Sequence, residues 1–332
     1  MAIPSRRNAM LAVLLALASA LFFTSTYVLN RAMANGGGHW AWSASLRYLL
    51  TLPMLALVLP WQGGFAPVRS ALRAHPWIWL AWSGIGFALF CVCLTWAAAF
   101  APAWLVAGTF QLTVIAGMLL APLLYRDERA RLPRAALALG GLIVLGVALM
   151  QGAHFHGHFD RYAWLALGAV ALSAFLYPLG NRAILLHLER SGEELNATQR
   201  VFGMTLASQP FWWLVAAYAG SVAGAPAPAQ VLLAAGVALF TGTIATILFF
   251  HATGMVRNDP AALGAVEAMQ AAELLFSSAL GIVLLGEPAP RGPAAAGAVL
   301  VVLGIAGLGL LVGRESAGHP RATKTLRTDR GA

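Results

Sequence analysis

The stretch LAVLLALASALFFTSTYVLNRA, residues 11–32, decides the solvent in which this chain folds. Its one charged side chain is that of Arg31, next to the last residue. A helix needs about 20 mainly apolar residues to cross the roughly 30 Å hydrocarbon core of a bilayer. The stretch is long enough, so it predicts a membrane-spanning helix.

The composition of the whole chain points the same way. Hydrophobic residues make up 60% of the 332 and charged residues 10%, whereas soluble domains average about 45–50% and 25%. The formal net charge of +9 comes mainly from arginines that stand between apolar runs. Membrane-topology signals are distributed in this way, whereas a nucleic-acid-binding module gathers its charge on one face. The composition therefore predicts an all-α integral membrane protein with the lipid bilayer as its partner, and it argues against nucleic-acid binding.

Apolar runs of spanning length recur along the chain, and we count ten. They cover residues 9–31, 39–60, 76–99, 102–124, 134–151, 161–187, 198–219, 229–252, 259–285 and 293–313. Short segments rich in glycine, proline and arginine separate them. Residues 314–332 are polar and basic, and we expect them to form a disordered cytoplasmic tail.

Polar residues repeat in the same order in the two halves. The tripeptide Asn-Arg-Ala at 30–32 recurs 151 residues later at 181–183, and Arg47 matches Arg200 at an offset of 153. The later pairs, at offsets of 158 to 159, are Pro102 with Pro260, Gln111 with Gln270, and Glu128 with Glu287. The offset grows slowly, as loop insertions would make it do. We therefore predict two five-helix repeats, residues 1–155 and 156–313.

An odd number of helices makes the second repeat enter the membrane from the opposite side. With the N-terminus inside, the predicted cytoplasmic segments hold Arg6, Arg7, Arg69, Arg73, Arg126, Arg129, Arg131, Arg134, Arg190, Arg257, Arg314, Arg321, Lys324, Arg327 and Arg330. The outer segments hold Arg31, Arg161 and Arg291. Fifteen against three is a positive-inside bias. The chain is thus predicted to have ten transmembrane helices as two inverted five-helix repeats, with both termini cytoplasmic in a bacterial inner membrane.

Several local features resemble a known family. They are the two-repeat plan, LLGEP at the end of the ninth run, its echo LLYRDE at the end of the fourth, and arginines early in the second and seventh runs. Over about residues 9–313 the chain is similar to the EamA-type drug/metabolite transporters, and most like the multidrug resistance efflux transporters. The resemblance implies an inner-membrane carrier that exports a small molecule, a drug or metabolite, by alternating access.

The ninth run contains the most polar membrane face. Glu267, Gln270 and Glu273 follow at steps of three, so they span about 120° of the helix. A charge at the centre of a membrane helix costs about 2.5–3.5 kcal/mol, so this face should look into protein or water. One interpretation makes a glutamate the site of a proton or a cationic substrate, because desolvation raises its pKa. The other pairs the glutamates with Arg47 and Arg200 as fixed interhelical ion pairs.

Other polar side chains are candidates for the substrate path. Gln111 is the repeat partner of Gln270, and the two amides are expected to meet near the centre of the bundle. Tyr27 in the first run and Tyr177 in the sixth could line the same path. Ordinary hydrogen bonding between packed helices would also account for these residues.

Two arginines end the apolar part of the first helix in each repeat. Arg31 is predicted at the outer face and Arg182 at the inner one. Each could complement the helix dipole and snorkel to the interface. Alternatively, each acts as a gate that contacts carboxylates or substrate only when its own side is closed.

Two rival classes use other features. His154, His156 and His158 alternate in a predicted outer loop, which would suit a metal-binding membrane enzyme or a metal carrier. A non-transporting membrane protein is the third alternative. The prediction favoured by the repeats is a secondary transporter and not an enzyme, with a small molecule and, in an antiporter, protons as its partners. No cofactor and no oligomeric state are predicted.

Overall fold

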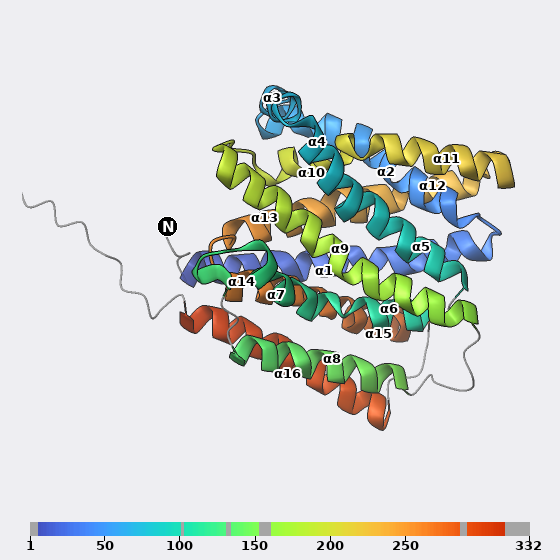
Figure 1. Ribbon diagram of the computed structural model, residues 1–332. Coiled ribbons are helices and arrows are strands. Elements are labelled where there is room, and N and C mark those ends of the chain that lie inside the picture. Colours follow the sequence, from blue (N-terminus) through green and yellow to red (C-terminus); the bar gives the residue numbers. More distant parts are fainter. Residues whose placement is uncertain (1–5, 101–102, 131–133, 153–160, 286–290, 316–332) are drawn as a thin grey trace, which may run out of the picture.

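The computed structural model describes residues 6–100, 103–130, 134–152, 161–285 and 291–315. Within these ranges every regular element is a helix (Figure 1). The elements are α1 (Arg6–Asn35), α2 (Trp40–Val58), η1 (Leu59–Gln62), α3 (Ala66–Ala74), α4 (Pro76–Ser83), η2 (Gly84–Leu89), α5 (Phe90–Phe100), α6 (Ala103–Phe110), α7 (Thr113–Leu124), η3 (Glu128–Ala130), α8 (Arg134–Gly152), α9 (Arg161–Ser191), α10 (Ala197–Ala207), α11 (Gln209–Ala223), α12 (Pro228–Val237), η4 (Ala238–Ala245), α13 (Thr246–Met255), α14 (Pro260–Ala268), η5 (Met269–Ala271), α15 (Ala272–Leu285) and α16 (Pro293–Glu315).

Eight helical stretches of the described chain are long and apolar enough to cross a membrane. They agree with eight of the ten predicted runs, so the prediction of an all-α membrane fold is confirmed. The other two runs are divided. In residues 198–219, α10 and α11 meet at Ser208, and in residues 259–285, η5 separates α14 from α15. The count of ten spans stays a prediction.

Several spanning stretches change their helical geometry partway along. The segments η2 and η4 are π-helical and lie within residues 76–100 and 228–255. A turn at 111–112 divides α6 from α7, and the 3₁₀ segment η5 divides α14 from α15. Such interruptions leave backbone groups outside the regular ladder and often mark hinges or functional sites. None of the four was predicted from the sequence.

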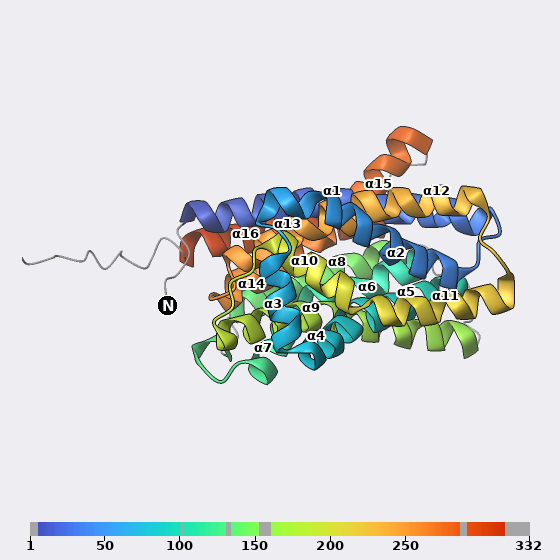
Figure 2. The same cartoon turned by 90° about the horizontal axis from the view of Figure 1, so that it is seen from above.

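The long helices run side by side along a common axis, as the two views together show, whereas α3 is seen end-on in Figure 1 (Figures 1 and 2). At one edge, α8 packs along α16. Glycines let these backbones approach closely, because a Cβ added to Gly297 would lie 2.4 Å from the carbonyl oxygen of Gly146. Small residues at a crossing are the usual way in which membrane helices gain packing contacts.

Exposed arginines lie at one end of the bundle. Arg6 and the last turn of α16 lie at the same end, on the left in Figure 1, which we call the N-terminal end. Helix α3, expected to be a loop, also lies there. Its Val68 and Ala71 are buried, while Arg69 and Arg73 are exposed. The exposed arginines of α3 therefore gather at the end that also carries both ends of the described chain.

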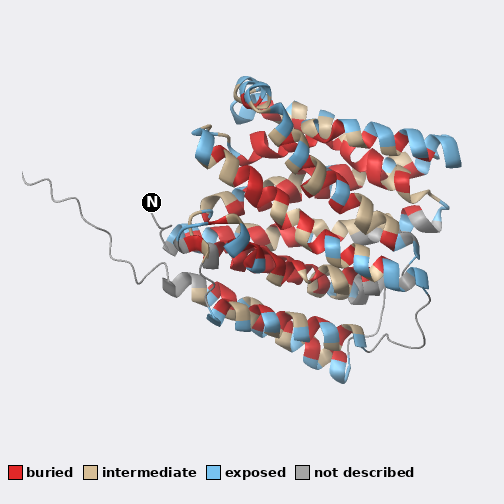
Figure 3. Cartoon of the chain, in the orientation of Figure 1, coloured by how far each residue is buried: buried red, intermediate tan, exposed pale blue. Residues whose placement is uncertain are grey.

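The most deeply buried element is α14 with the start of α15. All thirteen residues from 262 to 274 are buried, and they form the densest buried stretch in Figure 3. A helix that is buried on all sides is a core helix rather than a lipid-facing one. The polar residues of this segment are consequently enclosed by protein.

Candidate functional site

A buried ion pair joins α9 to α14. The Nε and Nη2 atoms of Arg182 donate hydrogen bonds to Oε1 and Oε2 of Glu267, at 2.9 and 2.8 Å. The exposed fractions are 0% for Arg182 and 2% for Glu267, so water does not screen the pair. Two parallel charge-assisted bonds fix the orientation of both side chains.

The pair lies directly on the backbone of α7. A Cβ added to Gly117 would stand 1.5 Å from Oε2 of Glu267 and 3.1 Å from Nη2 of Arg182. No other residue type fits at this position without moving the carboxylate. Three helices, α7, α9 and α14, therefore meet at one point, and a glycine permits it.

These contacts correct two expectations. Glu267 pairs with Arg182, not with Arg47 or Arg200. Arg182 does not snorkel from a helix end, because α9 continues to Ser191 and the Arg182 side chain is fully enclosed. Once the helix is longer than its apolar run suggests, the arginine stands inside the bundle and needs a buried counter-charge.

The two repeat-related glutamines lie at the helix interruptions. Gln111 follows the last residue of α6, and Gln270 is the middle residue of η5. Both are buried. Gln111 donates from Nε2 to the carbonyl of Ala107 at 3.4 Å, but its Oε1 and the Nε2 of Gln270 have no partner among the described residues. No hydrogen bond joins the two amides in the described structure, and that they meet near the centre of the bundle stays a prediction.

The other candidate residues lie on α1, α9 and α15. The Tyr177 hydroxyl on α9 is buried and unpartnered within the described residues, and its ring lies 5.0 Å from Phe90 and 5.6 Å from Phe249. Glu273, in the first turn of α15, is 6% exposed. Residues Tyr27 and Arg31 lie within α1, but their side chains fall outside the described part of the structure.

The repeat-related arginines on α2 and α10 have different surroundings. Arg200 donates from Nη2 to the carbonyl of Phe250 and stands 5.5 Å above the Phe250 ring. Arg47 stands 5.5 Å above the ring of Tyr48, and within the described structure its guanidinium has no hydrogen-bond or ion-pair partner. Both residues are buried, and Nε of Arg47 and Nη1 of Arg200 are enclosed without a hydrogen-bond partner among the described residues.

A second set of ionic contacts closes the N-terminal end. Arg129, in η3, contacts Asp127 at 2.6 Å and Glu189 of α9 at 2.7 Å. Its guanidinium also lies 4.5 Å from the centre of the Tyr125 ring. The hydrogen bonds from Arg129 lower the pKa of the Asp127 carboxyl below its ordinary value. We call Asp127, Arg129 and Glu189 the η3 clamp, because they tie the segment after α7 to the end of α9.

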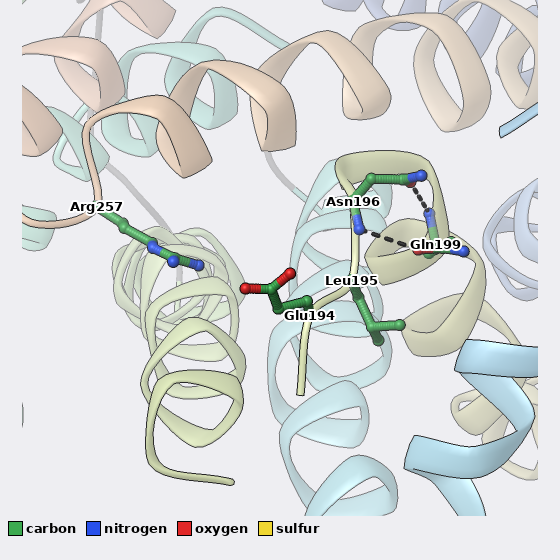
Figure 4. Close-up of a pocket in the computed structure, with 5 residues that line it drawn as sticks. All are labelled: Glu194, Leu195, Asn196, Gln199 and Arg257. Atoms are coloured by element: carbon green, nitrogen blue, oxygen red, sulfur yellow. Dashed lines mark hydrogen bonds between the residues drawn. The ribbon is translucent and has the colours of Figure 1, made fainter. Parts of the chain in front are cut away.

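A pocket of about 410 Å³ opens at the same end, between α9, α10 and the segment after α13 (Figure 4). Glu194 and Arg257 point toward each other across it. Asn196 and Gln199 bond to each other's backbone as a capping box for α10. The pocket is therefore polar and lies at the surface rather than at membrane depth.

The metal hypothesis is not supported by any described group. His154, His156 and His158 lie outside the described residues. In the part of the chain that the structure describes, no cluster of three histidine, cysteine, aspartate or glutamate residues is placed to hold a metal ion.

Sequence reasoning missed Gly117 and the η3 clamp. Gly117 is one of 34 glycines, and only its approach to Glu267 distinguishes it. Arg129 was assigned to the cytoplasmic topology signal, but it is 8% exposed and bonded to two carboxylates. The acids flanked by bases in RDER, residues 126–129, were the available sequence signal for the clamp.

Comparisons with known proteins give matches that cover most of this chain. A family model described as "EmrE: Putative multidrug resistance efflux transporter" matches residues 10–313. The uncharacterized protein YjlA of Bacillus subtilis (strain 168) is 41% identical over 305 residues, covering 89% of this chain and 93% of that protein. An uncharacterized 42.1 kDa protein of Shouchella clausii is 38% identical over 261 residues, covering 77% and 68%.

A solved crystal structure shares the fold. It superposes with a TM-score of 0.65 at 19% sequence identity, covering 92% of this chain and 98% of the solved one. At that identity the match concerns the architecture of the helices.

Proposed function

Because the chain belongs to the putative multidrug resistance efflux transporter family, a family of membrane transporters and not of enzymes, we propose that it is an inner-membrane carrier that exports a small molecule by alternating access. The observation that carries the proposal is the Arg182–Glu267 pair, a bidentate ion pair enclosed where α7, α9 and α14 meet. Intramembrane charges are costly, and in carriers they commonly belong to the substrate or ion pathway.

Matched helix irregularities support an inverted repeat with halves at 1–155 and 156–313. The π-helical segments η2 and η4 begin at Gly84 and Ala238, an offset of 154. The breaks at Gln111 and Gln270 are offset by 159. Both offsets follow the series found between the repeated polar residues. Interrupted helices at corresponding positions of two halves are the best local pointer to a transport site.

The pair has the geometry of a gate at the N-terminal end. Both of its residues belong to the second predicted repeat, and the pair packs directly against Gly117 on α7 of the first. On that end α14 packs against α7, whereas α15 packs mainly on α1 and has no comparable contact with α6 in the described structure. We infer that the N-terminal end, which we assign to the cytoplasm, is the closed one here.

We propose that the export is coupled to protons, because the contact that closes this end depends on the charges of its two partners. A proton entering from outside and a substrate entering from inside would then favour opposite states, which is the requirement for antiport.

Purified protein in liposomes tests the function. We expect saturable counterflow of an exported compound. Either single change, Arg182→Met or Glu267→Met, should lower the free energy of unfolding by about 3–5 kcal/mol, because it leaves one buried charge unpaired. The double change should recover most of this loss. If the pair is the coupled gate, the double variant Arg182→Met/Glu267→Met still loses proton-driven transport. Wild-type transport with wild-type pH dependence in that variant would instead make the pair structural.

Single cysteines test the inverted topology. Ser70 on α3 and Ala225 between α11 and α12 are exposed and occupy equivalent interhelical segments, at an offset of 155. With Cys91 and Cys93 replaced by alanine, Ala225→Cys should react with an impermeant thiol reagent in whole cells, and Ser70→Cys only after permeabilisation. Labelling of both from one side would contradict the inversion.

A further inference from the structure

Helix α3 lies across the bundle rather than along it. It is seen end-on in Figure 1 and runs across the long helices in Figure 2. The change of direction begins at Gly63 and Gly64, which follow η1 with φ angles of 89° and 73°. Glycine adopts this left-handed region without the steric cost that other residues have. A helix that crosses the spanning helices at the end of the bundle has the orientation of an interfacial helix, which lies in the plane of the membrane surface.

The body of the protein fixes the position of α3. Asn196, at the start of α10, donates from Nδ2 to the carbonyl of Gln62 at 2.7 Å. Val68 and Ala71 are buried, and Cγ1 of Val68 lies 3.3 Å from the position of a Cβ added to Gly203 on α10. One face of α3 is therefore packed on protein. The opposite face is exposed at the end of the bundle.

An exposed tryptophan stands before α3 and another stands after it. Trp61 in η1 is 81% exposed, and Trp77 in the first turn of α4 is 78% exposed. Trp61 follows the part of α2 that presents Leu57 to the outside. Tryptophans collect at the headgroup level of a bilayer, because the indole ring is apolar and its N–H is polar. The two indoles place both ends of α3 at that level.

The open face of α3 carries two arginines without partners. Arg69 and Arg73 are exposed, and within the described structure neither forms an ion pair or a hydrogen bond through its guanidinium. They are four residues apart, so they are neighbours on one side of the helix, where like charges repel each other. The chain has no aspartate or glutamate before Asp127. An anion bound between the two guanidiniums would neutralise both and remove their repulsion.

The anion that is present at headgroup level is the phosphodiester of a phospholipid. A guanidinium binds phosphate oxygens through two parallel N–H groups. A lipid with a net negative charge is favoured over a zwitterionic one, whose ammonium group opposes the arginines. We propose that α3 is an interfacial helix on which Arg69 and Arg73 bind the headgroup phosphate of an anionic phospholipid, while Trp61 and Trp77 contact the adjoining part of the bilayer. The binding does not depend on what the protein transports.

Hydrogen exchange in lipid nanodiscs tests the site. The protein is placed in nanodiscs of phosphatidylglycerol or of phosphatidylcholine with the same acyl chains, and amide exchange is followed in residues 66–74. We expect slower exchange in phosphatidylglycerol. Arg69→Gln/Arg73→Gln should abolish the difference. In detergent, native mass spectrometry should show phosphatidylglycerol binding weakened about fivefold by either single change, the amount that one basic side chain contributes at an anionic surface.

A control variant removes the same charge elsewhere. Arg126→Gln/Arg190→Gln changes two exposed arginines outside α3, and it should leave the exchange of residues 66–74 dependent on the lipid. Equal exchange in the two lipids, or a lipid effect that both double variants keep or both lose, overturns the proposal. Inorganic phosphate that slows the exchange equally in phosphatidylcholine nanodiscs would make this a site for free anions and overturns the lipid as its ligand. If Arg69→Gln/Arg73→Gln does not fold, each single change must still reduce the lipid effect, and an unchanged effect in both overturns it.

Discussion

Gly117 shows how one residue without a side chain sets the position of two charges. Its missing Cβ leaves the space that Oε2 of Glu267 occupies. The glutamate itself could be found from the sequence, because a carboxylate in an apolar run is conspicuous. Its partner could not, because two arginines in other helices were equally plausible. Only the packing of both α9 and α14 on α7 brings Arg182 within 2.8 Å of Glu267. Composition carries no information on which helices cross.

Gly117→Ala should separate the ion pair. Because the added Cβ would overlap the carboxylate, we expect a loss of stability of about 3–5 kcal/mol, the range for a broken buried pair. Thermal unfolding in detergent measures it. Gly141→Ala on α8 is the matched control, since a Cβ there meets nothing within 4 Å. Equal effects of the two changes would contradict the contact.

At the scale of elements, apolar length predicted most helix limits within a few residues. The bilayer fixes the length of a spanning helix, so the boundaries are visible in hydropathy. The interruptions were not predicted, because η2, η4 and η5 change backbone geometry without changing composition. The break between α10 and α11 did have a signal, because Pro210 stands at the start of α11, where proline favours a helix beginning.

The η3 clamp should be insensitive to pH in the physiological range. Its Asp127 carboxyl has a pKa below the ordinary 3.8 in the folded state. A lowered pKa contributes stability above the unfolded value, and that contribution is lost as the pH falls through the folded value. Amide exchange in residues 125–130, corrected for intrinsic rates, should stay constant from about pH 8 to 5 and rise only below about pH 4.

Variants separate the clamp from its neighbours. Arg129→Gln should raise the exchange of this segment at neutral pH, whereas Arg126→Gln, at an exposed arginine, should not. If the exchange rises steeply between pH 7 and 5, a group other than Asp127 holds the segment. If the exchange instead stays constant, any pH dependence of transport in that range arises outside the clamp.

At the scale of the molecule, the two predicted repeats meet along α7 and α14. The Cβ of Met118 lies 3.9 Å from the position of a Cβ on Gly264, within the range that a disulfide requires. Met118→Cys/Gly264→Cys should therefore oxidise readily, lock the N-terminal end and abolish counterflow until reductant is added. Each single cysteine is the control. Transport that survives complete cross-linking would mean that α7 and α14 do not separate.

The order of synthesis gives the buried ion pair a further consequence. Arg182 leaves the ribosome 85 residues before Glu267, a delay on the order of 4 to 17 s at ordinary rates of chain synthesis. During that time α9 must enter the membrane with its charge unneutralised. A chain that stops before α14 keeps an orphaned arginine in the membrane. The pair can thus report completion of the chain, and truncated copies would be open to removal by membrane quality-control proteases.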